Sequence, residues 1–378
     1  MAFEEVMNAV SDSSTNQQKQ VVIVKGGPGT GKSVIALKLL GEFARAGLNI
    51  SHATGSKAFT ETLRDIVGRR AGNVFRYFDA FGAADENELD VLICDEAHRI
   101  RATSNSRFTR RERRSDLPQV DELVSVARVP VFLLDENQVV RPYEIGTVET
   151  IGDSARRHHA RVREVDLNGQ FRLLGSEAYV EWVERLLGIR PGGPIEWTVD
   201  DPFDLRVADS AEEMETWLRR KNSDSVTARI AAGYCWPWSD PEDDGSLVND
   251  VQIGSWTKPW NARPGKKKLK DAPIASLWAS DPRGFEQVGC IYTAQGFEYD
   301  FGGTIFGADF VWRDGGWAPD KSRHADGVVK KALNFDVLVR NIYKVLLTRG
   351  LKGCGVLSTD PETQEKLKSL IPTHTRAF

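Results

Sequence analysis

The stretch VVIVKGGPGTGKS, residues 21–33, is the part of the sequence that decides the fold. It opens with a wholly apolar, β-branched run, which is typical of a central parallel strand covered on both faces. The pattern G-x-x-x-x-G-K-S follows, and then Ile35, Leu39 and Phe43 repeat at helical spacing up to a capping glycine, Gly47. A strand, a glycine-rich turn and a helix in this order predict a phosphate-binding loop rather than an unrelated glycine-rich turn.

The residue types of this loop suit a nucleotide with its metal. Glycines let backbone N–H groups face a phosphate, and the helix N-terminus adds partial positive charge. Lys32 can reach the β- and γ-phosphates, and the Ser33 hydroxyl can coordinate Mg²⁺, so the expected cofactors are ATP and Mg²⁺. The residues expected to line the phosphates are Gly26, Gly27, Pro28, Gly29, Thr30, Gly31, Lys32 and Ser33.

Two further apolar runs, 91–94 and 131–134, each lead straight into acidic residues. Ligand-binding groups of open α/β sheets lie at such carboxyl ends of strands. After the first run, Asp95 is expected to hold Mg²⁺, directly or through water, and Glu96 to polarise the attacking water as general base. After the second run, Gln138 is a candidate sensor of the γ-phosphate. An acidic pair at a strand end can also begin a solvated loop, and DENQ can form a plain turn.

Length and composition describe a globular chain with two domains. Its 378 residues exceed one ordinary core and suit two α/β domains with parallel central sheets. With 40% hydrophobic and 28% charged residues, and no apolar run near the roughly 18 residues that cross a bilayer, no membrane partner is expected. The acidic N-terminus lacks a signal-peptide pattern, and four separated cysteines predict buried free thiols, without disulfide or zinc, in a reducing cytoplasm.

The distribution of patterns predicts a lead-in over 1–20, a first lobe over 21–160 and a second lobe over 161–378. We place the boundary near the polar, basic segment 153–163. Strand-like runs resume in the second lobe at 228–234, 289–293, 304–306 and 345–347. The polar stretches predicted as loops are 99–114, 239–246 and 261–273.

Two arginines of the second lobe are candidates for the nucleotide site. An arginine that reaches across a cleft between lobes can neutralise charge developing on the γ-phosphate. The candidates for this role are Arg172, in the string QFR, and Arg349, in the string TRG. A single arginine more often forms a surface salt bridge.

The order of these motifs resembles that of superfamily 1 helicases, and most closely the Schlafen group 3-like DNA/RNA helicase domain, from about Val21 to about Leu357. The strings similar to motifs I, Ia, II, III, IV, V and VI are GGPGTGKS (26–33), HATGSKAFTETLR (52–64), DEAH (95–98), LLDENQ (133–138), LNGQFR (167–172), YTAQGFEYD (292–300) and VLLTRG (345–350). The QGFE string and the D-x-x-Q form of motif III favour superfamily 1 over superfamily 2. The stretches IAAGYCW (230–236) and 280–300 look like the Schlafen-like branch.

The resemblance implies two RecA-like P-loop NTPase lobes around ATP and Mg²⁺. It implies γ-phosphate contacts from Gln138, Arg172 and Arg349, and it places Gly296 and Glu298 near the nucleotide sugar and the strand-binding face.

Nucleic acid, either DNA or RNA, is the partner that the resemblance implies, because motif Ia touches the strand in the family. Basic side chains could contact the backbone and tryptophans could stack on bases, although charged runs are more often solvated loops and tryptophans more often core. The candidates are Thr54, Lys57, Thr60, Arg64, Trp236, Trp256, Trp260 and the runs RFTRRERR (107–114) and KKKLK (266–270).

Departures from the family pattern weaken the expectation of strand unwinding more than the expectation of ATP hydrolysis. Leu134 stands where motif III usually has a glycine, and the chain begins only about 20 residues before the phosphate-binding loop, without an upstream nuclease or accessory domain. We therefore keep a second hypothesis: an ATP-gated regulator or sensor that binds a protein partner or a foreign nucleic acid without unwinding it. The resemblance suggests defence against foreign nucleic acid for such a protein, and a separate nuclease is a further candidate partner. A third, a small-molecule kinase, is disfavoured by the second-lobe motifs.

Overall fold

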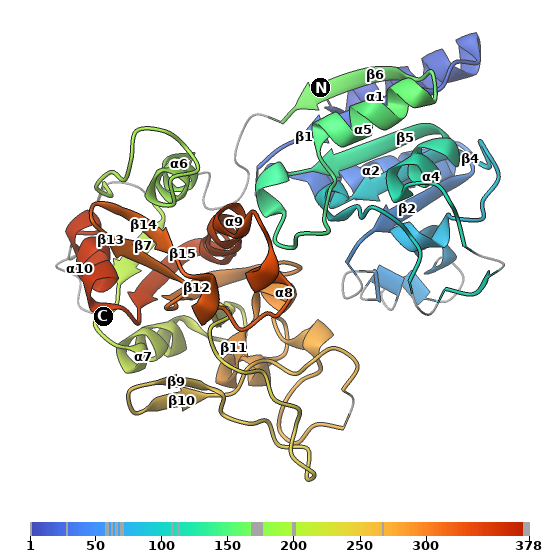
Figure 1. The fold of residues 1–378 in the computed structure, drawn as a ribbon. Helices are drawn as coiled ribbons and strands as arrows, with labels where there is room; N and C mark the ends of the chain where they lie inside the picture. Colours follow the sequence, from blue (N-terminus) through green and yellow to red (C-terminus); the bar gives the residue numbers. More distant parts are fainter. Residues whose placement is uncertain are drawn as a thin grey trace. The chain divides into compact units, whose positions relative to one another are not determined.

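The structure is a computed structural model, drawn in Figure 1, and it describes residues 2–372 with internal gaps. The residues outside this description are Met1, Pro28, 57–59, 62, 65–66, 69–71, 107–108, 112–113, 168–176, 199–201, 267 and 373–378. The chain divides into two compact units, residues 1–171 and 172–378, and each is described by itself.

A six-stranded parallel sheet forms the first unit, with strand order β3-β2-β4-β5-β1-β6. Its strands are β1 (Gln20–Lys25), β2 (Ile50–Thr54), β3 (Phe75–Tyr77), β4 (Leu89–Asp95), β5 (Ala127–Leu134) and β6 (Arg161–Asp166). The apolar run predicted as a central strand is β1, which lies between β5 and β6 with Val21 to Val24 fully buried. The runs before DEAH and DENQ are β4 and β5, so all three predicted strands are confirmed.

Helices cover both faces of this sheet. They are α1 (Ala2–Asn16) and α2 (Lys32–Arg45) on one face, and α4 (Gln119–Ser125) and α5 (Val148–Arg157) on the other. Helix α2 is the one predicted after the loop, and Gly47 follows its end with a φ of 77°. The lead-in over 1–20 is mostly helix α1, whose small buried residues Ala2, Val6 and Ala9 face the sheet.

The predicted boundary segment is not a linker. Residues 153–163 contain the end of α5 and the start of β6. Strand β6 pairs with β1 from Gln20–Arg161 to Lys25–Asp166, so residues 161–166 belong to the first sheet and not to the second lobe. Its charged composition suits an edge strand that has one solvated side.

A five-stranded parallel sheet forms the second unit, with strand order β11-β8-β12-β15-β7. Its strands are β7 (Asp204–Val207), β8 (Ala228–Ala232), β11 (Val288–Gly289), β12 (Tyr299–Phe306) and β15 (Gly350–Ser358). The helices are α6 (Glu177–Leu186), α7 (Ala211–Lys221), α8 (Ile291–Ala294), α9 (Phe335–Leu347) and α10 (Pro361–Leu370). Two antiparallel hairpins are β9 (Val251–Ile253) with β10 (Trp256–Lys258), and β13 (Phe310–Arg313) with β14 (Gly316–Pro319). Both central sheets are parallel, as predicted for two RecA-like α/β lobes.

Two strand-like runs of the second lobe are mainly helical. Residues 289–293 cover only the end of β11 before α8 begins, and 345–347 is the last turn of α9. Helix α9 is buried almost continuously from Leu338 to Leu347, so its sequence shows a continuous apolar run that resembles a buried strand. None of the helices within the described residues has the length and apolar character needed to cross a membrane.

Candidate nucleotide-binding site

The glycine-rich loop joins β1 to α2 at the carboxyl edge of the first sheet. Gly29 and Gly31 have φ angles of 86° and 83°, in the left-handed region that favours glycine. The Lys32 ammonium folds back and donates to the carbonyl oxygens of Gly26 and Gly27 at 2.6 and 2.8 Å. The loop therefore holds a cation beside the N-terminus of α2, and both features attract phosphate.

The loop is also closed by contacts within itself. The Thr30 hydroxyl donates to the carbonyl of Gly27 at 3.0 Å. A Cβ on Gly26 would collide with that hydroxyl, so this position has no space for a side chain. Pro28, the remaining loop residue of the prediction, lies outside the described residues.

Ser33 and Asp95 meet at the same edge of the sheet. Asp95 ends β4, and its buried carboxylate accepts a hydrogen bond from the backbone N–H of Glu96 at 2.9 Å. The Ser33 hydroxyl lies close enough to affect the pKa of this carboxyl. The imidazole Nε2 of buried His52, on the neighbouring strand β2, lies 3.7 Å from Asp95 Oδ2. Burial alone would raise the pKa of the Asp95 carboxyl, but His52, Ser33 and the N–H of Glu96 outweigh it and the pKa falls below its usual value. Asp95 therefore stays ionised beside a hydroxyl.

Glu96 begins a tight turn directly after β4. Its backbone is left-handed, with φ 54° and ψ 44°, and the 3₁₀ helix η3 (Ala97–Arg99) follows. Its carboxylate Oε2 lies 2.8 Å from Nε of Arg99, a close ion pair without the alignment of a hydrogen bond. Arg99 was predicted to begin an exposed loop, but its side chain is only 12% exposed, so that part of the prediction is wrong.

His98 of the DEAH string is a buried, neutral side chain. Burial, followed by the nearby charge of Arg99, lowers the pKa of the imidazole to about 3, and neither ring nitrogen has a hydrogen-bond partner among the residues that the structure describes. Gly146, on the loop after β5, packs on this turn so closely that a Cβ would overlap the carbonyl oxygen of Ala97 and lie 2.9 Å from the Cα of His98. The loop that follows motif III thus packs directly on motif II.

Gln138 lies in a second 3₁₀ turn, η5 (Glu136–Gln138), directly after β5. Its amide donates to Asp135 Oδ2 at 3.1 Å, and Asp135 also caps the turn by accepting from the N–H of Asn137 at 3.0 Å. The N–H of Gly26 donates to the carbonyl of Leu134 at 3.2 Å, which connects this strand end to the phosphate-binding loop. The first unit therefore gathers motifs I, II and III at one edge.

The second unit brings motifs V and VI together. Arg349, which precedes β15, is 4% exposed. Its guanidinium donates to the carbonyl of Gln295 at 3.3 Å and to that of Val345 at 3.2 Å. Gly296 and Glu298 lie in the turn between α8 and β12, beside this contact, and both are partly exposed.

Arg172, with the rest of motif IV from residue 168 onward, lies outside the described residues. Its predicted contact with the γ-phosphate stays a prediction.

Comparison with known proteins decides the family. The family model for the Schlafen group 3 DNA/RNA helicase domain matches residues 19–360, nearly the whole chain. The chain belongs to the Schlafen group 3 DNA/RNA helicase domain family. The resemblance seen in the sequence is thereby confirmed.

Other similarities are more distant. An uncharacterized protein of Saccharomyces cerevisiae is 25% identical over 400 residues, covering 91% of this chain and 83% of that protein. The Pif1 helicase from Bacteroides, solved with ADP-AlF3 and ssDNA, is 14% identical over 98% of this chain and 94% of that chain, with a TM-score of 0.37. The Pif1 helicase from Candida albicans is 11% identical over 97% and 98%, with a TM-score of 0.36. These TM-scores are too low to support a conclusion, so the family assignment rests on the match to the family model.

Most predicted strand contacts of motif Ia are engaged inside the first unit. Thr54 and Thr60 are buried, and the Thr60 hydroxyl donates to the carbonyl of Ser56 at 3.0 Å. Arg64 donates to the carbonyl of Phe75 at 2.6 and 2.9 Å. Thr54 and Thr60 therefore shape the motif and present no donor at its surface, while Lys57 lies outside the described residues.

The tryptophans and the basic run of the second unit also have internal partners. Trp256 and Trp260 are 6% and 1% exposed, so the prediction that they stack on bases is wrong, because they fill a core beneath the long loops. Trp236 is partly exposed, and its indole donates to the carbonyl of Gln252 at 3.1 Å. In the KKKLK run, Lys266 pairs with Asp240 at 3.2 Å and Lys270 with Asp244 at 2.9 Å. These pairs reduce the attraction of this run for a phosphate backbone.

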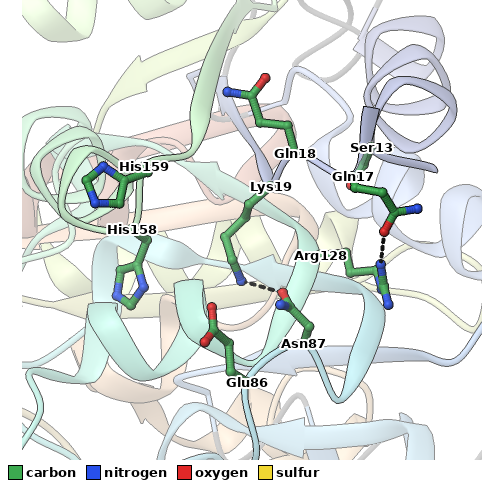
Figure 2. Close-up of a pocket in the computed structure, with 9 residues that line it drawn as sticks. All are labelled: Ser13, Gln17, Gln18, Lys19, Glu86, Asn87, Arg128, His158 and His159. Carbon is green, nitrogen blue, oxygen red and sulfur yellow. Dashed lines mark hydrogen bonds between the residues drawn. The ribbon is translucent and has the colours of Figure 1, made fainter. Parts of the chain in front are cut away.

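A cavity of about 280 Å³ lies at the opposite, amino edge of the first sheet (Figure 2). Its lining consists of Ser13, Gln17, Gln18, Lys19, Glu86, Asn87, Arg128, His158 and His159. Figure 2 shows the Lys19 ammonium directed at Asn87, to which it donates at 2.8 Å. The same ammonium donates to the carbonyls of Val124, Ser125 and Ala127 at 2.7 to 2.9 Å, and burial lowers its pKa to about 8. Lys19 thus caps the end of α4, and this cavity is not the nucleotide site.

Three residues near motif II were not singled out from the sequence. His52 stands in the string compared with motif Ia, so only the pairing of β2 with β4 reveals its contact with Asp95. Arg99 follows DEAH directly, and the i, i+3 spacing from Glu96 was the available signal. Gly146 has no local signal, because its close approach to Ala97 arises from packing between two loops.

Proposed function

We propose that this chain is an ATP-hydrolysing, helicase-like motor core that acts on nucleic acid. Membership of the helicase domain family supports the general class. The observation that carries the finer proposal is that Ser33 and the buried Asp95 carboxylate meet at one edge of the sheet, beside the loop that holds Lys32, with the hydroxyl close enough to lower the pKa of Asp95. A hydroxyl, a carboxylate and an ammonium in one place form the chemical set that a nucleoside triphosphate with a divalent cation requires.

The residues present fit Mg²⁺. Asp95 Oδ2 is buried and accepts no hydrogen bond within the described part of the chain, because its neighbour His52 Nε2 is 3.7 Å away, and burial of a carboxylate oxygen without a hydrogen bond is costly. Carboxylate and hydroxyl oxygens are the hard ligands that Mg²⁺ prefers. Asp95 and Ser33 would hold the cation, which neutralises charge on the β- and γ-phosphate oxygens when it is bound.

The other candidate residues have separate roles in binding and hydrolysing ATP. Lys32 binds the phosphates, and Glu96 orients and polarises the attacking water. Gln138 reports the presence of the γ-phosphate, because its amide is bonded to Asp135 at the end of β5 and the loop that follows packs on motif II at Gly146. Arg349 and Arg172 stabilise negative charge as the terminal phosphate departs. Gly296 and Glu298 contribute contacts near the sugar.

The proposal is tested by the rate of phosphate release from ATP with Mg²⁺, with and without single-stranded DNA or RNA. We expect stimulation of at least about tenfold by one of the two, which corresponds to about 1.4 kcal/mol of transition-state stabilisation. Lys32→Ala is the control for contaminating ATPases and should show no release. Absence of both stimulation and strand binding at low salt, where phosphate contacts are strongest, would contradict the proposal.

A second candidate is an ATP-gated sensor that does not separate strands. The pairing of Lys266 and Lys270 with acidic residues favours it, since one expected nucleic-acid surface is partly neutralised. Nucleotide binding with slow, unstimulated hydrolysis would support this candidate instead. Strand displacement from a labelled duplex, dependent on ATP, would exclude it.

A further inference from the structure

The ion pair between Glu96 and Arg99 places a cation on the proposed general base. Arg99 Nε lies 2.8 Å from Glu96 Oε2, and the two side chains are 12% and 22% exposed. Exposed ion pairs contribute little, but this pair is largely shielded from solvent, so its attraction is less screened. One oxygen of the carboxylate is therefore engaged by the protein itself.

The backbone enforces this contact. Glu96 is the N-cap of η3 and Arg99 its last residue, and the N–H of Arg99 donates to the carbonyl of Glu96 at 2.9 Å. Side chains three residues apart in a 3₁₀ turn stand one above the other. The left-handed conformation of Glu96 fixes where this turn starts, so the pairing follows from the local geometry.

Arg99 also touches the start of motif Ia. Gly55 follows β2, and a Cβ placed on it would lie 2.7 Å from the Cβ of Arg99 and 3.4 Å from its Cδ. The arginine stem therefore packs on the Gly55 backbone. Arg99 therefore contacts motif II through Glu96 and the segment expected to contact a strand through Gly55.

We propose that Arg99 is a positioning residue that couples strand binding to ATP hydrolysis, and this inference rests on the proposed function. Without nucleic acid, Arg99 holds the Glu96 carboxylate in the ion pair and slows hydrolysis. A phosphodiester lying over motif Ia offers the guanidinium a second anion, with geometry suited to two parallel hydrogen bonds. Transfer of Arg99 to the strand releases Glu96 to polarise water.

The test compares Arg99→Met with wild type in the ATPase assay, with and without single-stranded DNA and RNA. Methionine keeps an unbranched stem against Gly55 and removes the charge. We expect the rate without nucleic acid to rise about threefold to tenfold, and the stimulation factor to fall below about twofold. Arg99→Lys, which keeps a cation, should retain a low unstimulated rate. The matched control is Arg101→Met, because Arg101 is exposed and its guanidinium stacks on Tyr143 at 5.3 Å.

A second variant moves the arginine without replacing it. Gly55→Ala forces the Arg99 stem to shift, so it should also raise the unstimulated rate. This variant keeps the test valid if Arg99→Met fails to fold, which thermal melting would reveal.

Several outcomes would overturn the inference. Unchanged rates and an unchanged stimulation factor in Arg99→Met would show that the ion pair is only structural. An equal fall of both rates would show that Arg99 holds Glu96 in its active orientation. In both cases a stimulated wild type leaves the proposed function intact. A wild type that hydrolyses ATP without any stimulation would instead contradict the proposed function, and the inference with it.

Discussion

The two units present their candidate residues at opposite edges of their sheets. In the first unit Lys32, Asp95 and Gln138 follow strands β1, β4 and β5, at the carboxyl edge. In the second unit Glu298 and Arg349 immediately precede β12 and β15, at the amino edge. A carboxyl edge with a helix N-terminus binds phosphate, whereas Arg349 provides one guanidinium held by neutral carbonyls. Under the proposed function the first unit therefore supplies binding and chemistry, and the second adds charge stabilisation.

Lys32→Ala should give the largest effect in this comparison. It removes the cation of the loop, so binding and hydrolysis should both fail. We expect kcat to drop by at least about 10³-fold, together with weaker nucleotide affinity. Phosphate release and titration with a fluorescent ATP analogue measure the two effects. If Lys32→Ala hydrolyses ATP with the wild-type kcat, the assignment of the nucleotide site to the first unit is wrong.

Arg349→Ala should distinguish the role of the second unit from that of the first, because it should lower kcat and leave nucleotide binding nearly unchanged. We expect kcat to drop by about 10²- to 10³-fold with nucleotide affinity changed by less than about threefold, since the contact strengthens in the transition state. Arg349 is buried, so a melting curve must show that the variant is folded. An unchanged kcat would remove this arginine from the site.

Gly146→Ala should have the smallest effect of these three substitutions. It tests how much the packing of Gly146 on Ala97 stabilises the first unit. A Cβ there would overlap the Ala97 carbonyl, and relief of this contact should cost about 1–3 kcal/mol of the free energy of unfolding. Denaturant titration measures the loss. Gly152→Ala is the matched control, because the nearest atom to its Cβ is Arg156 Nη1 at 3.7 Å within a helix, where alanine stabilises by about 0.5–1 kcal/mol. Equal stabilities for the two variants would contradict the packing argument.

The parts of the fold predicted correctly from the sequence share strong local signals. A wholly apolar β-branched run before a glycine-rich turn identifies β1, and the acidic residues after β4 and β5 mark the same edge. Helix α1 was missed because its buried face consists mainly of small residues such as Ala2 and Ala9. Residues 345–347 were taken as a strand because burial on all sides removes the helical period of α9.

The candidate site was predicted as a set of residue types, not as contacts. The i, i+3 spacing of Glu96 and Arg99 was visible in the sequence. The contact of His52 with Asp95 and the approach of Gly146 to Ala97, by contrast, depend on strand register and loop packing. A single sequence gives no direct signal for such neighbours. Charge runs were misleading for the same reason, since KKKLK is partly neutralised by acids about 26 residues away in sequence.

Under the proposed function, Glu96 polarises the attacking water while Lys32 and Asp95 hold the nucleotide with its cation. The most direct test is the identity of the nucleotide retained by Glu96→Gln after incubation with radiolabelled ATP, Mg²⁺ and single-stranded nucleic acid, followed by rapid gel filtration. Loss of the general base should slow hydrolysis by about 10²- to 10⁴-fold without loss of binding. We predict that Glu96→Gln retains intact ATP, whereas wild type yields ADP. Recovery of ADP from the variant at the wild-type rate would contradict the account.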